Sequence, residues 1–138
     1  MSSTGKFVTE TTFHVRYAET DAMRIVHHSS YVVWFEEARS DYTRQRGEDY
    51  ANFERQGLYL AVTEVNARYL KPASYGHQVT IRTWIEALQS RGMTFAYEVL
   101  HAETRETLVT GHTKHICIDG QGAVKRIPEA WKKWAENG

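Results

Sequence analysis

Alternation of apolar and polar residues with a period of two runs through most of this chain. Four segments carry it, Phe7–Tyr17, Tyr59–Tyr69, Val79–Ala87 and Met93–Val99, and a fifth, Leu108–Ile118, is rich in β-forming residues but alternates less cleanly. Successive side chains of a strand point to opposite faces, so each row predicts a strand that buries one face.

The segments between several predicted strands are short and rich in turn residues. They are Ser74–Gly76, Gln89–Gly92 and Glu103–Arg105. Connections of this length predict antiparallel strands joined as a meander.

One stretch follows a helical period instead. Its apolar positions have the spacing of an amphipathic stripe and are Tyr31, Trp34, Phe35, Ala38 and Tyr42. We expect Ser29 or Ser30 to cap the start of this helix and Gly47 to follow its end. Because Val32 and Val33 widen the apolar surface, the helix is predicted to be wrapped by the sheet.

Two shorter helices are expected at Tyr50–Arg55 and at Pro128–Glu136, where proline occupies the first turn. The resulting order predicts an α+β architecture, with an antiparallel sheet of about five strands around one long central helix. The length of 138 residues predicts a single domain, residues 1–138.

Composition narrows the class of protein. The formal net charge is zero and the pI is about 7.1, which argues against a general nucleic-acid binder but permits a local basic patch for a phosphorylated ligand. The single cysteine, Cys117, cannot form an intrachain disulfide and favours a reducing compartment. With no secretory signal and no long apolar run, we expect a soluble, cytoplasmic protein without a membrane span.

The densest polar cluster lies between the first predicted strand and the long helix, at residues 16–31. Free N–H groups at a helix start, together with the helix dipole, can stabilise a developing oxyanion. A carboxylate such as Asp21 can activate water or attack a carbonyl. The residues alone therefore indicate a candidate acyl-transfer site, but an aspartate before a helix is more often a turn or capping residue, and that is the alternative for Asp21.

Other chemistries find little support. His112 and His115 are three residues apart in a predicted strand and would point to opposite faces, so the pair is a poor chelate. Cys117 has no activating motif nearby and is expected to be a small buried residue. There is no G-x-S-x-G elbow and no Walker-type glycine loop. We expect neither a metal nor a cofactor.

Several linked motifs resemble the signature of the 4-hydroxybenzoyl-CoA thioesterase family, and look most like its Tol-Pal-associated subgroup. The motifs are Tyr17–Asp21, His28–Tyr31 and Phe35–Arg39, followed in matching order by Arg68–Ala73 and Val79–Ile85. The resemblance implies a hotdog fold and an acyl-CoA thioesterase that releases free acid and CoA. It also implies a homo-oligomer, a dimer or commonly a tetramer, whose subunits pair edge to edge and build composite sites.

The resemblance also implies roles for individual residues. Asp21 matches the catalytic aspartate, acting as nucleophile or as general base. His28 matches the helix-start residue that offers its backbone N–H to the thioester carbonyl, and its ring is a candidate for positioning substrate or water. Tyr31 matches a residue lining the acyl pocket. Glu36 and Arg39 match helix positions that we expect to be structural.

Further substrate contacts are expected from charged residues. Arg68, Lys71, Arg82 and Arg91 are candidates for binding CoA phosphates at a subunit boundary, with Lys71 and Arg91 preferred because they lie at turns; ordinary solvated charge is the alternative for each. The family usually has glycine in place of Arg24 and an aromatic residue in place of His27. The first difference predicts an altered loop path. The second adds charge beside the acyl pocket and makes His27 a candidate substrate-binding residue.

Two other functions remain open at this stage. One is a thioesterase that acts on an acyl carrier protein, and the other is a non-catalytic protein that binds acyl thioesters. Dehydration of a hydroxyacyl thioester is disfavoured, because no histidine-containing dehydratase motif is present.

Overall fold

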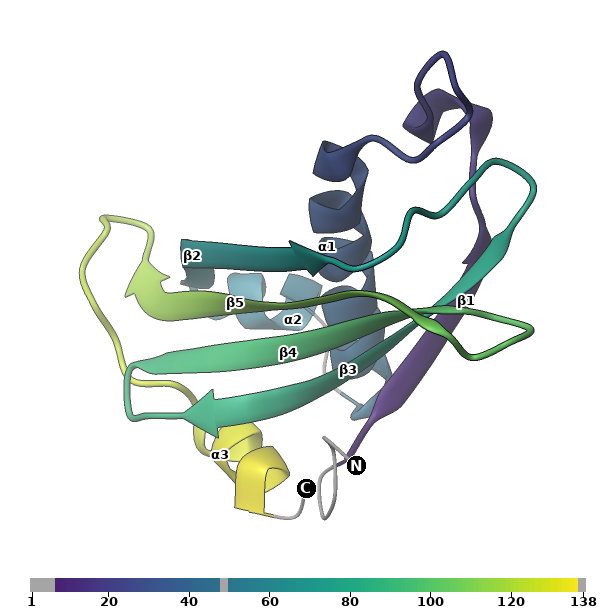
Figure 1. Cartoon of the computed structure of the whole chain (residues 1–138). Helices are drawn as coiled ribbons and strands as arrows, with labels where there is room; N and C mark the ends of the chain where they lie inside the picture. The colour runs from purple at the N-terminus through teal and green to yellow at the C-terminus, as the bar shows by residue number, and fades with distance from the viewer. Residues whose placement is uncertain (1–6, 48–49, 137–138) are drawn as a thin grey trace.

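The computed structural model describes residues 7–47 and 50–136 (Figure 1). Its elements follow the predicted order of one strand, a long helix and four further strands. They are β1 (Thr9–His14), a 3-10 turn (Tyr17–Glu19), α1 (His28–Gln45), α2 (Tyr50–Arg55), β2 (Leu58–Tyr69), β3 (Gln78–Leu88), β4 (Gly92–His101), β5 (Thr107–Asp119) and α3 (Glu129–Glu136). The predicted α+β class is confirmed. Within the described ranges, no helix is both long enough and apolar enough to cross a membrane.

The five strands form one antiparallel sheet in the order β1-β3-β4-β5-β2. Strands β3, β4 and β5 are a meander, as the short turns predict. The prediction is wrong at Ser74–Gly76, since β2 pairs with β5 at the far edge instead of with β3. Residues of this connection contact the loop before α1: Ser74 forms a bridge with Ile25, and the Tyr75 N–H donates to the Arg24 carbonyl over 2.9 Å. Turn residues predict that the chain reverses, but not which strand it meets next.

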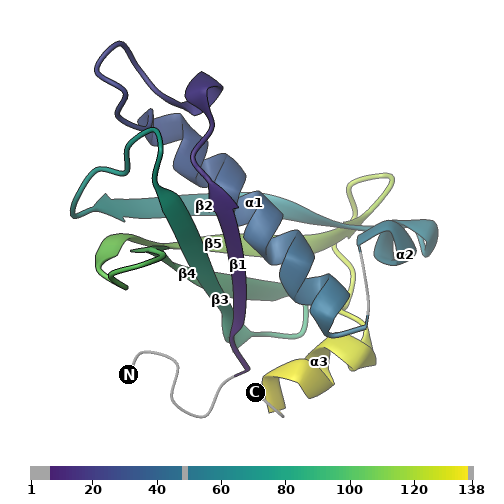
Figure 2. The ribbon, with the colours of Figure 1, turned by 90° about the vertical axis from the view of Figure 1, so that its right-hand side faces the viewer.

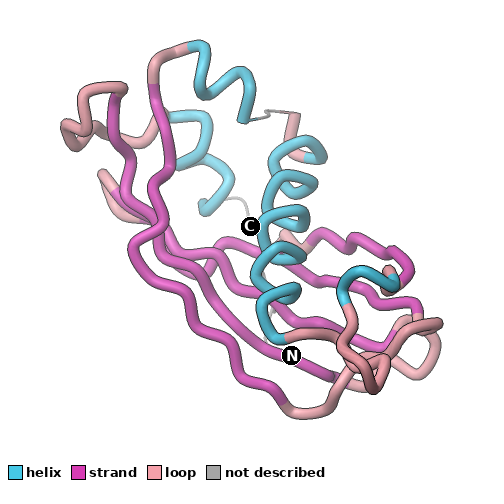
Figure 3. Tube along the Cα trace, turned by 90° about the horizontal axis from the view of Figure 1, so that it is seen from above, coloured by secondary structure: helices cyan, strands magenta, loops and turns pink. Residues whose placement is uncertain are grey.

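Helix α1 lies in the concave face of the curved sheet (Figures 2 and 3). The five residues of the predicted apolar stripe are all buried. Burying a large apolar side chain typically stabilises a fold by about 1.5–3 kcal/mol, so this stripe is a major part of the core. Val33 is 53% exposed and does not widen the buried face as predicted, because it borders an open cavity beside β1.

The start of α1 differs from the prediction. His27 is the N-cap, and its Nδ1 lies 2.8 Å from the Ser29 hydroxyl and accepts from the Ser29 N–H. Ser29 and Ser30 lie inside the first turn, so neither is the cap. At the other end, Gly47 follows the last turn with a φ of +87°, the left-handed conformation that glycine adopts at little cost.

The remaining boundaries need small corrections. Strand β1 is shorter than the predicted Phe7–Tyr17, because the chain enters the 3-10 turn at Tyr17. The predicted helix Tyr50–Arg55 is observed as α2, and α3 begins one residue after Pro128. Trp131 on α3 is buried against Phe53 on α2, with ring centroids 5.1 Å apart; the Trp134 side chain lies outside the described residues.

A glycine allows α1 to approach the sheet. The Phe35 ring stacks on Tyr97 of β4 with centroids 4.3 Å apart and also covers Gly111 of β5. A Cβ at Gly111 would lie 2.8 Å from two Phe35 ring carbons and 2.5 Å from the Asn66 carbonyl oxygen. Any larger residue would therefore push the helix or strand β2 outward.

Beneath α1, the core contains a chain of polar groups. Arg39 donates to the Tyr97 hydroxyl over 3.1 Å, Tyr97 shares a 2.6 Å hydrogen bond with Thr113, and Thr113 shares one of 2.7 Å with His115 Nε2. Burial, assisted by the charge of Arg39, lowers the pKa of His115 from 6.5 to about 3. Arg39 thus has a structural contact, as predicted, and His115 is a neutral core residue.

This burial predicts a pH dependence of stability. The unfolded state binds a proton at His115 more tightly than the folded state, so the contribution of His115 to the free energy of unfolding is fully present above pH 6.5. It is lost as the pH falls toward about 3, with a slope of at most about 1.4 kcal/mol per pH unit. Urea unfolding between pH 6.5 and 4 should show a shallower dependence for His115→Gln than for the wild type. Equal slopes would contradict the buried, neutral state of this ring.

Candidate active site

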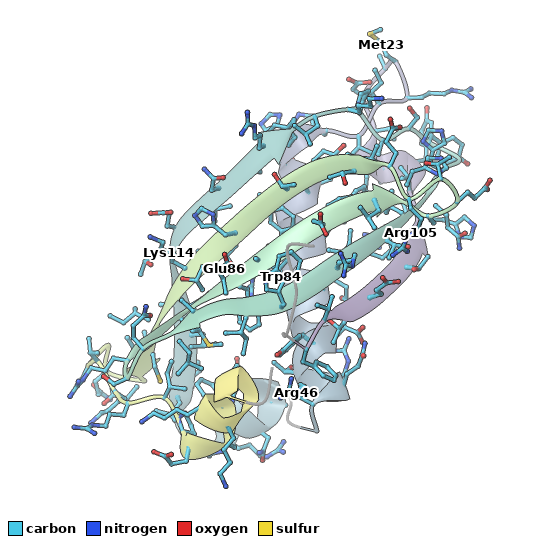
Figure 4. All side chains as sticks on the ribbon, turned by 60° about the horizontal axis from the view of Figure 1, so that its bottom comes forward. Met23, Arg46, Trp84, Glu86, Arg105 and Lys114 are labelled. Carbon is cyan, nitrogen blue, oxygen red and sulfur yellow. The ribbon has the colours of Figure 1, made fainter. Side chains whose placement is uncertain are left out.

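Residues 16–27 form a closed loop between β1 and α1. The Asp21 N–H donates to the Ile25 carbonyl over 2.9 Å, and Thr20 forms an antiparallel bridge with Val26. The loop extends beyond the sheet, and Met23 lies at its tip (Figure 4). It is also bound to the segment that joins β2 and β3, where the Val26 N–H donates to the Ala73 carbonyl over 2.9 Å.

Asp21 is exposed and stabilises this loop. Its Oδ1 accepts from the N–H groups of Met23 (2.8 Å) and Ile25 (3.2 Å). Within residues 7–47 and 50–136, its Oδ2 accepts no hydrogen bond. One carboxylate oxygen therefore builds a turn while the other is available to a substrate or water.

The same turn occurs a second time in the chain, at residues 119–123. Asp119 Oδ1 accepts from the N–H groups of Gln121 (2.8 Å) and Ala123 (3.0 Å), and the Asp119 N–H donates to the Ala123 carbonyl over 2.9 Å. The fourth residue of the turn is Gly122, with a φ of +84°. Turn formation alone thus accounts for the observed hydrogen bonds of Asp21, and Asp119 provides an internal control for its chemistry.

Arg24 occupies the position that corresponds to Gly122. Its φ is +64°, in the left-handed region that non-glycine residues rarely adopt. The turn keeps the hydrogen bonds of its glycine-containing counterpart in this chain, and the arginine backbone takes up the strain. The difference in loop path from the family stays a prediction.

The start of α1 presents a free amide. His28 is the first helical residue, and among the described residues its N–H has no acceptor. The rings of His27 and His28 stack with centroids 4.5 Å apart, and both side chains are exposed. The helix dipole adds partial positive charge at this point, which suits a developing negative charge on a ligand.

A cavity of about 270 Å³ opens beside this helix start. Its wall is formed by Val26, His28, Tyr31, Tyr69, Leu70, Lys71 and Pro72, and does not include Asp21. Tyr31 accepts a 3.2 Å hydrogen bond from the Ala73 N–H, and burial raises its pKa above 10, so the phenol is neutral. The structure thus brings together three predicted residues, His28, Tyr31 and Lys71.

Tyr69 is a cavity residue that the sequence did not indicate. Its hydroxyl donates to the His28 carbonyl over 3.3 Å, and its ring lies 5.4 Å from that of Tyr31. The alternation marked it as an inward position of a strand. Its place at the last residue of β2, next to Lys71, was the signal that it borders an opening.

Lys71 and Arg91 do not share a site within one chain. Lys71 follows β2 and pairs with Glu106. Arg91 lies in the β3–β4 turn and lines a different cavity of about 460 Å³ together with Thr63, Ser90 and Lys114. The Arg91 carbonyl accepts from Cys117, which is opposite Leu60 near the start of β2, so the two cations lie toward opposite ends of that strand.

The histidines provide no chelate in the parts of the chain that the structure describes, and no group of three or more potential metal ligands is found there. His112 bonds to Glu64 over 2.8 Å on the outer face of the sheet, whereas His115 points into the core, as their spacing predicts. Cys117 is buried, in agreement with its predicted role.

Comparison with known families assigns the chain to a superfamily. The sequence model of the thioesterase-like superfamily matches residues 15–135. The chain belongs to the thioesterase-like superfamily. The match includes the loop, α1 and all of β2 to β5.

Relatives in this superfamily agree with the assignment. YneP of Bacillus subtilis, provisionally named an acyl-CoA thioesterase, is 34% identical over 112 residues, which are 81% of this chain and 80% of that protein. A solved DHNA-CoA thioesterase from Staphylococcus aureus is 35% identical, has a TM-score of 0.85, and matches over 94% of this chain and 87% of its own. A solved hypothetical protein from Thermus thermophilus is 37% identical, also with a TM-score of 0.85, over 92% of this chain and 96% of its own.

These similarities confirm the predicted hotdog fold and the prediction that this member of the superfamily is an enzyme. They support the thioesterase class. They do not show whether the chain belongs to the 4-hydroxybenzoyl-CoA thioesterases or to their Tol-Pal-associated subgroup, which its motifs resemble most. The roles of Asp21, His27, His28, Tyr31, Lys71 and Arg91 stay predictions.

The left-handed residue of the loop gives a testable consequence. Arg24→Ala keeps the strain of a φ of +64°, whereas Arg24→Gly removes it, at the cost of extra chain entropy in the unfolded state. Left-handed backbone costs about 1–2 kcal/mol for a residue with a Cβ. We therefore expect Arg24→Gly to be more stable than Arg24→Ala by about 1 kcal/mol in urea unfolding. Equal stabilities would show that the loop relaxes around residue 24.

Proposed function

We propose that this protein is an acyl-CoA thioesterase that hydrolyses the thioester to a free acid and CoA. The observation that carries the proposal is the position of His28, which lines the Tyr31–Tyr69 cavity and whose N–H at the start of α1 has no acceptor among the described residues, in a chain of the thioesterase-like superfamily. The thioester carbonyl would lie against this amide, with the acyl group in the cavity. The Asp21 loop leads directly into the same helix start.

The chemistry requires two groups. As a general base, Asp21 takes a proton from water, whose oxygen attacks the carbonyl carbon; as a nucleophile, its carboxylate attacks first, and water then cleaves the resulting anhydride. In both routes the oxyanion accepts from the His28 N–H, and its collapse expels the CoA thiolate, which takes up a proton. A positioned acid or base typically contributes about 10²- to 10⁴-fold in rate, and one oxyanion donor roughly 10²- to 10³-fold.

The cavity supports a small acyl group. A volume of about 270 Å³ walled by two tyrosines suits an aromatic or short aliphatic acid better than a long chain. The exposed His27 beside it adds a polar contact for a hydroxylated or charged acyl group. The name of the DHNA-CoA thioesterase relative makes aromatic acyl-CoA a useful first substrate.

A second copy of the chain would complete the site. Strand β2 is at an edge of the sheet and carries exposed apolar residues, including Tyr59, Val62 and Val65. A partner added antiparallel along this edge would bring Arg91 of the partner subunit toward Lys71. The two cations would then be available to the phosphates of one CoA molecule. A tetramer and a cytoplasmic location stay predictions from the sequence.

The central test compares two aspartates in the same type of turn. Asp21→Asn and Asp119→Asn should both lower stability, because each changes a carboxylate that accepts from two amides, and Asp119→Asn should cost at least as much, because it also removes the ion pair with Lys125 at 3.7 Å. Only Asp21→Asn should lower kcat, by at least about a hundredfold. Free-thiol release from aromatic, short-chain and long-chain acyl-CoA substrates measures this effect.

The outcomes separate the alternatives. Near-normal turnover by Asp21→Asn would reduce Asp21 to a turn residue. Thiol release from an acylated carrier protein, but not from any acyl-CoA, would favour the carrier-protein enzyme. Tight binding of acyl-CoA without thiol release would favour a non-catalytic binding protein.

The edge of the sheet provides a test of assembly. Val65→Lys places a charge on the exposed β2 edge and should shift the protein toward a monomer in analytical ultracentrifugation, with loss of thioesterase activity. Val33→Lys is the matched control, because Val33 is an exposed valine on α1 away from that edge. A fully active wild-type monomer would contradict the composite site.

A further inference from the structure

Glu19 is a buried carboxylate at the junction of β1, the Asp21 loop and α1. It is 8% exposed, and three donors converge on it: the Arg16 backbone N–H (2.8 Å), the Arg16 guanidinium (2.7 Å) and the Trp34 indole N–H (2.7 Å). The sequence places Glu19 in a motif, but its spacing does not show that the side chain turns inward. The Trp34 contact spans fifteen residues and joins the loop to the interior of the helix.

The backbone of Glu19 closes the other side of the loop. Its carbonyl accepts from the His27 N–H (2.8 Å) and from the Ser30 hydroxyl (3.4 Å), and its N–H donates to the Arg16 carbonyl (2.9 Å). Glu19 thus contacts Arg16 at the start of the loop, the N-cap His27 at its end and Ser30 in the first turn of α1. The position of the whole loop on the helix therefore depends on Glu19.

The charge state of Glu19 suits an anchor and not a base. Burial alone would raise its pKa, but the hydrogen bonds from Arg16 and Trp34 outweigh burial and hold the pKa below the usual 4.5. The carboxylate is ionised at neutral pH, and its lone pairs are directed at three donors. Asp21, two residues later, is exposed and keeps one oxygen free, so the two acidic residues have different tasks.

Trp34 connects this anchor to the cavity. It is fully buried, and its ring makes edge contacts with Tyr31 of the cavity wall (centroids 4.9 Å apart) and with Phe13 of β1 (5.3 Å). Movement of Trp34 would therefore disturb both the acyl-binding wall and the loop. A path of direct contacts runs from the loop through Glu19 and Trp34 to Tyr31.

We propose that Glu19 is a positioning residue, which holds the Asp21 loop in register with the helix start and the acyl cavity through its bonds to Arg16 and Trp34. This role rests on the proposed function of Asp21. Glu19 is not in the cavity wall and acts through the position of its neighbours. Misplacement of a reacting group by about 1 Å can cost roughly a hundredfold in rate, so loss of this anchor should be visible in turnover.

The first experiment compares Glu19→Gln with Glu98→Gln. Glu98 is a matched control, because it is a half-buried carboxylate that accepts from the Arg82 guanidinium over 2.8 Å, in β4 on the outer face of the sheet. Both variants should unfold at lower urea concentration than the wild type. Glu19→Gln should lower kcat about ten- to a hundredfold and leave KM within about twofold, whereas Glu98→Gln should leave kcat unchanged.

Two further variants test the path. Trp34→Phe keeps an aromatic ring and removes the indole N–H, so it should reproduce part of the loss in kcat; the double variant Glu19→Gln/Trp34→Phe should be no worse than Glu19→Gln alone. In an Asp21→Asn background, Glu19→Gln should cause little additional loss, because the group it positions is already gone. Full additivity in either double variant would overturn the proposal.

Amide hydrogen exchange separates this role from the proposed catalysis. The Met23 and Ile25 amides, which donate to Asp21, should exchange at least about tenfold faster in Glu19→Gln and at the wild-type rate in Glu98→Gln. Unchanged exchange, or equal losses of kcat in Glu19→Gln and Glu98→Gln, would overturn the role of Glu19 even if Asp21 is catalytic. Normal turnover by Asp21→Asn would instead overturn the proposed catalytic role of Asp21, and with it the idea that Glu19 positions a catalytic group, whatever the exchange rates show.

Discussion

The seating of α1 in the concave face of the sheet is the constraint on which the other features depend. Phe35 can lie flat on Tyr97 only because Gly111 has no Cβ, and this contact sets the depth of the helix. Close packing makes such a position stiff, since protein interiors have few voids into which a side chain could move. With the depth fixed, the first turn of α1 emerges beside the end of β2. There the Tyr69 hydroxyl bonds to the His28 carbonyl and the cavity forms between the two elements.

The polar contacts are arranged around this packed centre in two groups. Arg39, Tyr97, Thr113 and His115 form a chain inside the core, where every lost hydrogen bond would leave a desolvated group and cost about 1–3 kcal/mol. Glu19, Arg16 and Trp34 form a second group at the mouth of the helix. The first group fixes the middle of α1 on the sheet, and the second fixes the loop on the start of α1. The position of the loop is therefore set by its contacts with the packed helix, and not by the hydrogen bonds of its own short turn alone.

Much of the fold was predictable from local patterns, and the failures share a cause. The rows of β3 and β4, the buried helix stripe and Gly47 follow from periodicity and backbone preferences that each segment carries alone. The predicted buried row of β2 is wrong, because Tyr59 and Val65 are 41% and 43% exposed and a register shift between Val62 and Glu64 interrupts the alternation. The pairing of β2 with β5, the His27 cap and the inward turn of Glu19 depend on residues distant in sequence or on a choice among several competent caps. Within the candidate site, the motifs indicated Asp21, His28, Tyr31 and Lys71, but no role was predicted for Tyr69, which the contacts of the cavity revealed, and the separation of Arg91 from Lys71 followed only from the sheet order. Periodicity predicts the face of the sheet on which a side chain lies. It does not predict which strand is the neighbour, or which residues of that strand lie beside the side chain.

The repeated turn shows what distinguishes a reactive aspartate from a structural one. Asp21 and Asp119 make the same pair of hydrogen bonds to amides two and four residues later, so the turn itself confers no chemistry. The two differ in their surroundings. The loop of Asp119 leads into an irregular segment before α3, whereas that of Asp21 leads into the free His28 amide of an eighteen-residue helix and is tied to the interior of that helix through Glu19. When one carboxylate oxygen accepts both hydrogen bonds of the turn, the other oxygen can bind a ligand without breaking the hydrogen bonds that hold the loop. A common turn can thus become a candidate catalytic element when the packing beneath it places it at the mouth of a buried helix.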